Sequence, residues 1–182
     1  LRNRINTILA GHFVDPDWII NQKTGFMIDP SLTYKDYRTH RMVTNDYLKS
    51  SVEKSERRFR RLRIPVTSGK IIADQTLGFW TDLFELSHYR LLRGRPIQIF
   101  NHLPAGHGRI EICDRLNKVR KFRNRINHNE PICFNGNAID FNSAEDVYNS
   151  IIELLTWIDP ELINWIRNMD SVIVKINNAK KI

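Results

Sequence analysis

An arginine and a histidine five residues apart are the best candidates for chemistry in this sequence. Arg123 and His128 lie towards the end of residues 109–129, whose pattern predicts a helix that stops at about 128–130. Backbone carbonyls at the end of a helix favour a protonated imidazole, which suits His128 to general acid–base chemistry. Asn124 lies one turn earlier on the same face, where its side chain could orient the imidazole or a bound phosphate.

Arg123 occupies a position that the helical period assigns to an apolar face. An arginine stays charged, so at such a position it needs a carboxylate, a phosphate or water. Two interpretations follow: an internal ion pair with an acidic residue of a neighbouring helix, or a cation held ready for a phosphate group. The other residues on this face are Ile112, Leu116, Val119 and Ile126, and the candidate acidic partners are Asp82 and Glu85.

The spacing of the two candidate residues raises a geometric difficulty. On a straight helix, side chains five residues apart diverge by about 140°. Arg123 and His128 can meet if the last turn unwinds before Pro131, or if their side chains wrap around a shared cleft. A dimer that brings two copies of the helix together is the third possibility.

The rest of the chain shows helical periods and turns rather than strands. Convincing alternation of polar and apolar residues is absent, so the sequence predicts an all-α bundle of about five to six helices. The length fits one domain over residues 1–182, and Leu1 is expected to lie within a helix that begins upstream. The predicted helices cover residues 1–13, 34–62, 76–92, 109–129 and 143–158, with a further helix starting at Asp159-Pro160.

The composition predicts a basic cytosolic protein without a metal. The formal net charge is +8 and the isoelectric point is about 9.7, which favours a polyanionic partner such as nucleic acid. The chain has no apolar run of about 18 residues, and its first residues do not form a signal peptide, so no membrane association is expected. Cys113 and Cys133 match no zinc spacing and the histidines are scattered, so neither a metal nor another cofactor is expected.

Several arginines could follow a phosphate backbone. The densest run lies at the end of the helix predicted over residues 34–62, where the alternative is a solvated helix end whose cations the helix dipole favours. Trp157, Trp165 and His88 are instead predicted to be core residues. The arginines expected to contact phosphates are Arg57, Arg58, Arg60, Arg61, Arg120 and Arg125.

The residues around Arg123 resemble the signature of HEPN domains of the Abi-like, or abortive-infection, group. That signature is an arginine, a polar residue that is often asparagine, a few more residues and a histidine, and residues 119–132 read VRKFRNRINHNEPI. Residues 1–5, together with Phe13 and Trp18, resemble the first helix of the family, and residues 77–84 resemble its middle helix. A looser match in a glycine- and proline-rich loop lacks the asparagine and is interpreted as chance; it consists of Arg95 and His102.

The resemblance implies a HEPN-like fold and a metal-independent endoribonuclease of a phage-defence or toxin–antitoxin system. Such a protein would act as a homodimer in the bacterial cytoplasm, with RNA as substrate and an antitoxin protein as a possible partner. His128 would move a proton during attack of the 2′-hydroxyl on the adjacent phosphate, Arg123 would hold that phosphate, and Asn124 would orient one of them.

The family also has inactive members, which leaves a second interpretation open. In that interpretation the chain is a non-catalytic helical module that binds RNA or a partner protein, and Arg123 is a buried ion-pair residue. No helix-turn-helix pattern is evident, so a DNA-binding regulator is disfavoured.

Overall fold

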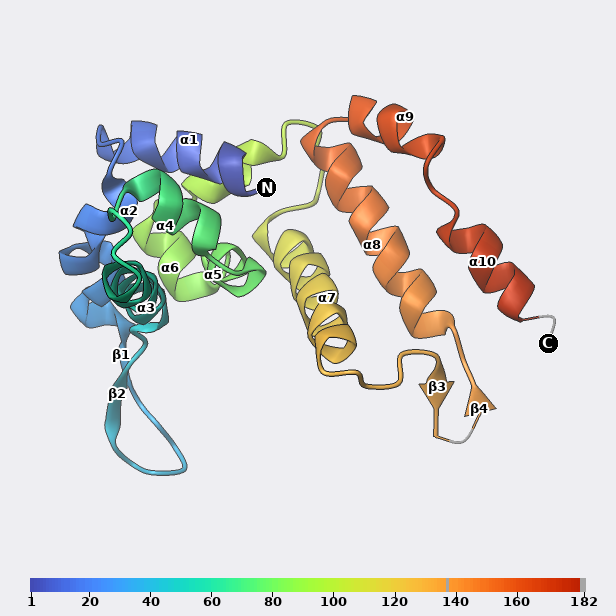
Figure 1. Cartoon of the computed structure of the whole chain (residues 1–182), viewed down its shortest axis with the longest axis horizontal. Coiled ribbons are helices and arrows are strands. Elements are labelled where there is room, and N and C mark those ends of the chain that lie inside the picture. Colours follow the sequence, from blue (N-terminus) through green and yellow to red (C-terminus); the bar gives the residue numbers. More distant parts are fainter. Residues whose placement is uncertain (137, 181–182) are drawn as a thin grey trace. The chain divides into compact units, whose positions relative to one another are not determined.

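The computed structural model describes residues 1–136 and 138–180, and this part of the chain is mostly helical (Figure 1). It contains ten α-helices, four 3-10 helices and two short antiparallel hairpins, which confirms the all-α class. The helices outnumber the five or six expected for two reasons. The helix expected over residues 76–92 and the one expected to start at Asp159 are each divided in two, and short helices also form at residues 18–21 and 68–74, where none was expected. The chain forms two compact units, Leu1–Ile99 and Phe100–Ile182, and each is described by itself. The single domain expected from the sequence stays a prediction.

The first unit consists of helices and one hairpin. Its α-helices are α1 (Arg2–Phe13), α2 (Trp18–Asn21), α3 (Tyr47–Arg61), α4 (Ser68–Asp74), α5 (Leu77–Asp82) and α6 (Leu86–Leu91). The 3-10 helices are η1 (Gln22–Thr24), η2 (Phe26–Ile28), η3 (Pro30–Leu32) and η4 (Arg95–Ile99), and the strands are β1 (Thr33–Lys35) and β2 (Met42–Thr44).

Large aromatic side chains fill the core of the first unit. Trp18 is fully buried, and its indole N–H donates a 2.9 Å hydrogen bond to Asn6 Oδ1. The rings of Phe13, Trp18 and Phe26 form a cluster, in which Phe13 stacks on both of the others and all centroid distances are 5.6–6.5 Å. His88 is also fully buried, which confirms its prediction as a core residue. Burial of this kind is the main stabilising contribution to a small helical unit.

The helix predicted over residues 34–62 begins only at Tyr47, so nearly the first half of that prediction is wrong. Residues 33–44 form the β1–β2 hairpin instead, with Tyr34 opposite Val43 and Lys35 opposite Met42. Threonine, tyrosine and valine favour a pleated strand, and the segment has no apolar stripe that a helix could bury. The Asp36 carboxylate accepts backbone hydrogen bonds within the tip, a local arrangement that competes with helix formation.

The second unit is centred on two long antiparallel helices. Its elements are α7 (Arg109–Asn127), β3 (Phe134–Asn135), β4 (Ala138–Ile139), α8 (Asn142–Ile158), α9 (Glu161–Arg167) and α10 (Val172–Ala179). Figure 1 shows α7 and α8 side by side, running in opposite directions. The Arg115 guanidinium lies 4.5 Å from the Trp157 ring centre, and Lys118 Nζ lies 2.8 Å from Asp146. These contacts join the two helices along their length.

The two tryptophans of the second unit have different environments. Trp157 is 5% exposed, which confirms its prediction as a core residue, whereas Trp165 is 71% exposed and that prediction is wrong. The helix expected to start at Asp159 is interrupted between α9 and α10. Asp170 caps the break by accepting a 3.0 Å bond from the Val172 N–H. In the described part of the chain, no helix has the length and apolar character to cross a lipid bilayer.

Candidate active site

The face of α7 that carries Arg123 changes character along the helix. Its first half is buried through Ile112 and Leu116, and it packs against α8. Its second half opens to solvent, because Ile126 is 48% exposed and the Arg123 side chain is exposed. Arg123 is therefore on the apolar face that the helical period assigned to it, but at a point where that face is no longer covered.

The end of α7 is defined by a network of backbone hydrogen bonds. His128 is the C-cap residue, and the following Asn129 adopts a left-handed conformation with φ of 54°. The Asn129 N–H donates to Ile126 O at 3.0 Å and the Glu130 N–H donates to Arg125 O at 2.9 Å, which together form a Schellman motif. The helix stops where the sequence predicts, and His128 is held at its exposed end.

We expect the conformation of Asn129 to be the local requirement for this helix end. A valine there would have to adopt positive φ, which costs an L-residue with a branched side chain about 1–2 kcal/mol. Asn129→Val should therefore lower the free energy of unfolding by that amount, measured by urea denaturation. Asn129→Gly is the matched control and should be close to neutral, because glycine adopts positive φ freely. Equal values for both variants would contradict this explanation of the helix end.

Arg123 lies at an apolar cavity of about 560 Å³. Residues of α7, α8 and α10 line this cavity, among them Phe122, Val147 and Ile176, with Lys175 as a second cation. Within the described part of its own unit, Arg123 has no hydrogen bond or ion pair. Its positive charge is thus available to an anion from outside that unit.

The two predicted acidic partners of Arg123 both lie in the first unit. Asp82 Oδ2 lies 2.8 Å from His88 Nδ1, so its carboxylate faces a buried imidazole. Glu85 borders a hollow of about 720 Å³ whose lining includes Ser87 of α6. An ion pair between Arg123 and either carboxylate stays a prediction.

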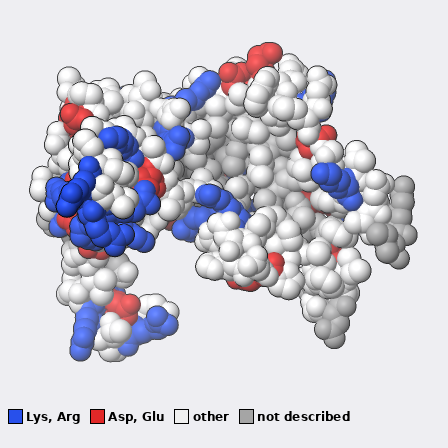
Figure 2. Space-filling view, in the orientation of Figure 1, with Lys and Arg blue, Asp and Glu red and all other residues white. Residues whose placement is uncertain are grey.

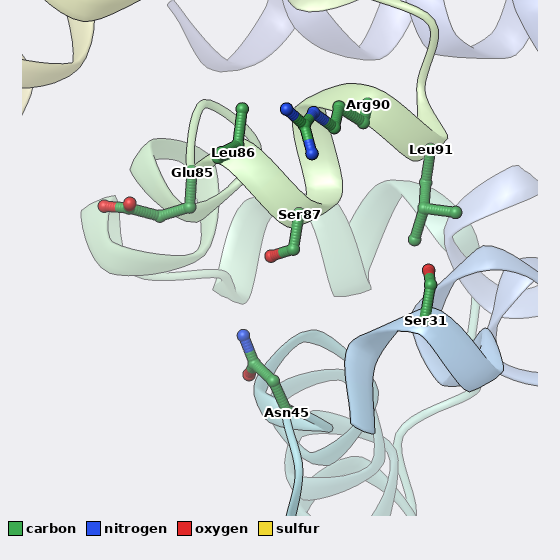
Figure 3. Close-up of a pocket in the computed structure, with 7 residues that line it drawn as sticks. All are labelled: Ser31, Asn45, Glu85, Leu86, Ser87, Arg90 and Leu91. Atoms are coloured by element: carbon green, nitrogen blue, oxygen red, sulfur yellow. The ribbon is translucent and has the colours of Figure 1, made fainter. Parts of the chain in front are cut away.

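Figure 3 shows the hollow beside Glu85, which sequence reasoning missed. The Ser87 hydroxyl and the Asn45 amide face each other across it, while the Glu85 carboxylate points away from both. Ser31 lines the hollow on the side away from Glu85, next to Leu91. These residues come from three separate segments of the chain, so no local pattern in the sequence could have revealed the hollow.

His128 does not line the cavity at which Arg123 lies. The helix stays regular as far as Asn127, so unwinding within its last turn does not bring the two side chains together. Asn124 is exposed, and its backbone carbonyl accepts the His128 N–H at 3.0 Å. One copy of α7 therefore presents the imidazole and the guanidinium on separate parts of an exposed helix end.

The arginines at the end of α3 form a cationic surface, visible over that helix in Figure 2. Three of them have acidic neighbours: Arg57 lies 3.6 Å from Glu53, Arg60 lies 3.9 Å from Glu56, and Arg58 pairs with Asp74. Arg61 has no such neighbour in the described part of the first unit. A hollow of about 360 Å³ is lined by Lys54, Arg57, Arg58 and Arg61.

The two other predicted phosphate contacts lie on α7 itself. Arg125 donates to the Pro131 carbonyl and its Nε lies 3.5 Å from Glu130, so it fastens the segment that follows the helix. Arg120 is half-buried, and its Nε has no hydrogen-bond partner among the described residues. The structure thus gives Arg125 a local structural contact that the sequence did not indicate.

The described residues contain no group of three or more histidine, cysteine, aspartate or glutamate side chains that could hold a metal ion. Cys113 is buried, Cys133 is half-buried, and neither forms a disulfide bond within the described part of the chain.

Comparison with models of protein families, with curated proteins and with solved structures gives no match to this chain.

Proposed function

We propose that this chain is a metal-independent endoribonuclease of the HEPN type, similar to the Abi-like group. The observation that carries the proposal is the exposed end of α7, which presents Arg123, Asn124 and His128 to solvent. Arg123 has no partner within the described part of its unit, which supports a role for its charge outside that unit. An internal ion pair, the main structural alternative for an arginine on an apolar face, has no support among the described residues of the second unit.

The proposed reaction needs only groups that the chain and the RNA supply. The 2′-hydroxyl of the substrate attacks the adjacent phosphorus, and the bond from phosphorus to the 5′-oxygen of the next nucleotide breaks. His128 accepts the proton of the attacking hydroxyl or delivers a proton to the leaving oxygen. Arg123 holds the phosphate and stabilises its developing charge, while Asn124 orients either the His128 imidazole or the phosphate. The products are a 2′,3′-cyclic phosphate and a 5′-hydroxyl end.

A homodimer is part of the proposal, because one copy separates Arg123 from His128. Large apolar side chains are exposed near Arg123, and a soluble protein rarely leaves a continuous apolar surface open. Examples from α7, α8 and α10 are Ile126, Ile151 and Val172, which are 48%, 37% and 43% exposed. A second copy packed on this surface would bring two α7 ends together. An antitoxin protein and a bacterial cytoplasmic location belong to the same proposal through the family resemblance.

The second candidate function is RNA binding without cleavage. The cationic surface of α3 favours it, since Arg61 and Lys54 have no acidic neighbour within 4 Å in the described part of their unit. Such a surface attracts phosphates whatever the chemistry at α7.

The purified chain, incubated in EDTA with labelled single-stranded and structured RNA, distinguishes the two functions. We expect cleaved RNA with 2′,3′-cyclic phosphate ends, and intact DNA of the same sequence, because DNA lacks the 2′-hydroxyl. Folded protein that binds the RNA but leaves it intact would contradict the nuclease and favour the binding module.

A further inference from the structure

The β1–β2 hairpin, residues 33–44, extends away from the helices of the first unit (Figure 1). Its side chains are unusually exposed for their type: Tyr37 is 83% exposed, Met42 is 66% exposed and Tyr34 is 53% exposed. The fold does not explain this exposure, since none of these three residues contributes to the core. Exposed aromatic side chains on a projecting element are typical of a surface that binds something.

The hairpin has an ordered structure up to its tip. The Thr33 and Thr44 hydroxyls lie 2.9 Å apart across the strands, and the Asp36 N–H donates to Arg41 O at 2.9 Å. Asp36 Oδ1 accepts the N–H groups of Thr39 at 2.7 Å and Arg38 at 2.9 Å. The hydrogen bonds from Thr39, followed by that from Arg38, hold the pKa of the Asp36 carboxyl below its ordinary value. The one carboxylate of the hairpin is thus occupied in holding the tip.

The cations of the hairpin are left without acidic partners. Lys35, Arg38 and Arg41 are exposed, and none has an ion pair in the described part of the first unit. Figure 2 shows these positive side chains around the single acidic one. His40, which is also exposed and has a φ of 56°, lies between Arg38 and Arg41 in the sequence. The tip is therefore a small surface of net positive charge that carries aromatic rings.

This combination fits single-stranded RNA better than another protein. Unpaired bases stack on aromatic rings, and the phosphates between them pair with arginine or lysine. A protein partner would leave several cations buried or unpaired unless it were strongly acidic. We propose that the β1–β2 hairpin is an RNA-binding arm, with an unpaired base on Tyr37 and the adjoining phosphates on Arg38 and Arg41.

The arm extends the proposed nuclease function, because it assigns a single-stranded substrate to the enzyme. Only the choice of RNA as the bound nucleic acid rests on that function. Binding is measured with a fluorescein-labelled single-stranded RNA carrying 2′-O-methyl riboses, which 2′-hydroxyl attack cannot cleave. Fluorescence anisotropy of the full chain gives Kd for this probe and for a duplex of the same sequence. A result for the arm is thereby obtained whether or not the chain cleaves RNA.

We expect Tyr37→Ala to raise Kd for the single strand about tenfold, the range of one base–aromatic stack. Tyr37→Phe should retain wild-type affinity, and the duplex should be unaffected by either change because its bases are already stacked. The double variant Arg38→Ala with Arg41→Ala should also raise Kd about tenfold and should flatten the dependence of log Kd on log salt by about 1.4.

Matched controls in the second unit are Trp165→Ala and Arg167→Ala, which remove an exposed aromatic ring and an exposed cation elsewhere. Both should bind the probe as the wild type does. Wild-type affinity in Tyr37→Ala and in the double variant would overturn the arm, as would an equal loss in the controls. Hairpin-dependent binding without cleavage of ordinary RNA would sustain the arm and contradict the nuclease alone.

Discussion

Replacement of Arg123 or His128 by alanine should each reduce RNA cleavage by at least about 100-fold. Loss of a positioned general acid or base typically costs a factor of this size, and so does loss of a group that stabilises the charge of the transition state. Both side chains are exposed, so the variants should unfold at the same urea concentration as the wild type. The measurement is the rate of appearance of 2′,3′-cyclic phosphate ends in EDTA.

The chain supplies its own control pair for this experiment. Arg95 and His102 form the second, looser arginine–histidine match, and both side chains are exposed. Arg95→Ala and His102→Ala should cleave RNA at the wild-type rate. Full activity in either Arg123→Ala or His128→Ala would rule out the proposed chemistry.

A mixture of the two inactive variants tests the homodimer. If each site takes its guanidinium from one copy and its imidazole from the other, mixing Arg123→Ala with His128→Ala restores one intact site in every mixed dimer. We expect partial recovery of cleavage after the copies exchange. No recovery, although pull-down of one variant through an affinity tag also retains the untagged other variant, would contradict a site shared between copies.

Trp18→Ala should lower the free energy of unfolding by about 3–5 kcal/mol, the largest effect on stability that we expect. Trp18 is fully buried against the rings of Phe13 and Phe26, so the change leaves a cavity that rigid helices fill poorly. It also removes the donor to Asn6 Oδ1, which leaves that oxygen without this bond. Urea denaturation followed by circular dichroism measures the change.

Trp165→Ala is the matched comparison, because this tryptophan is 71% exposed. Its removal should alter the free energy of unfolding by no more than about 0.5 kcal/mol. A similar loss in both variants would show that the burial of Trp18 does not determine the stability of the chain.

Local signals in the sequence predicted α7 well. Its apolar spacing is regular, and the proline at 131 marks its end. The β1–β2 hairpin was missed because its strands have three residues each, too few for alternation to be visible. The break between α9 and α10 depends on Asp170, whose capping bond competes with a continuous helix that the apolar spacing also permits.

The site was predictable only in part, for a related reason. The helical period placed Arg123 on the apolar face, and the structure agrees. Beyond Leu116, that face of α7 is only partly buried. The helices that pack on it, α8 and α10, follow much later in the sequence, so no short sequence pattern predicts how far the face is buried. The same limit applies to Trp165, whose spacing resembles that of a core residue although it is largely exposed.

The two-stranded sheet of the hairpin has a consequence for the behaviour of the protein in solution. Both of its strands are edge strands, so each presents unpaired backbone groups on which another extended segment could add. The exposed side chains of Tyr34 and Val43 favour the addition of a strand from a second molecule. Lys35 and Arg41 oppose it, because they repel the same positive charges on the hairpin of a second copy. The charges that would hold a phosphate therefore also guard the hairpin against edge-to-edge aggregation, so a change that neutralises them weakens this protection as well.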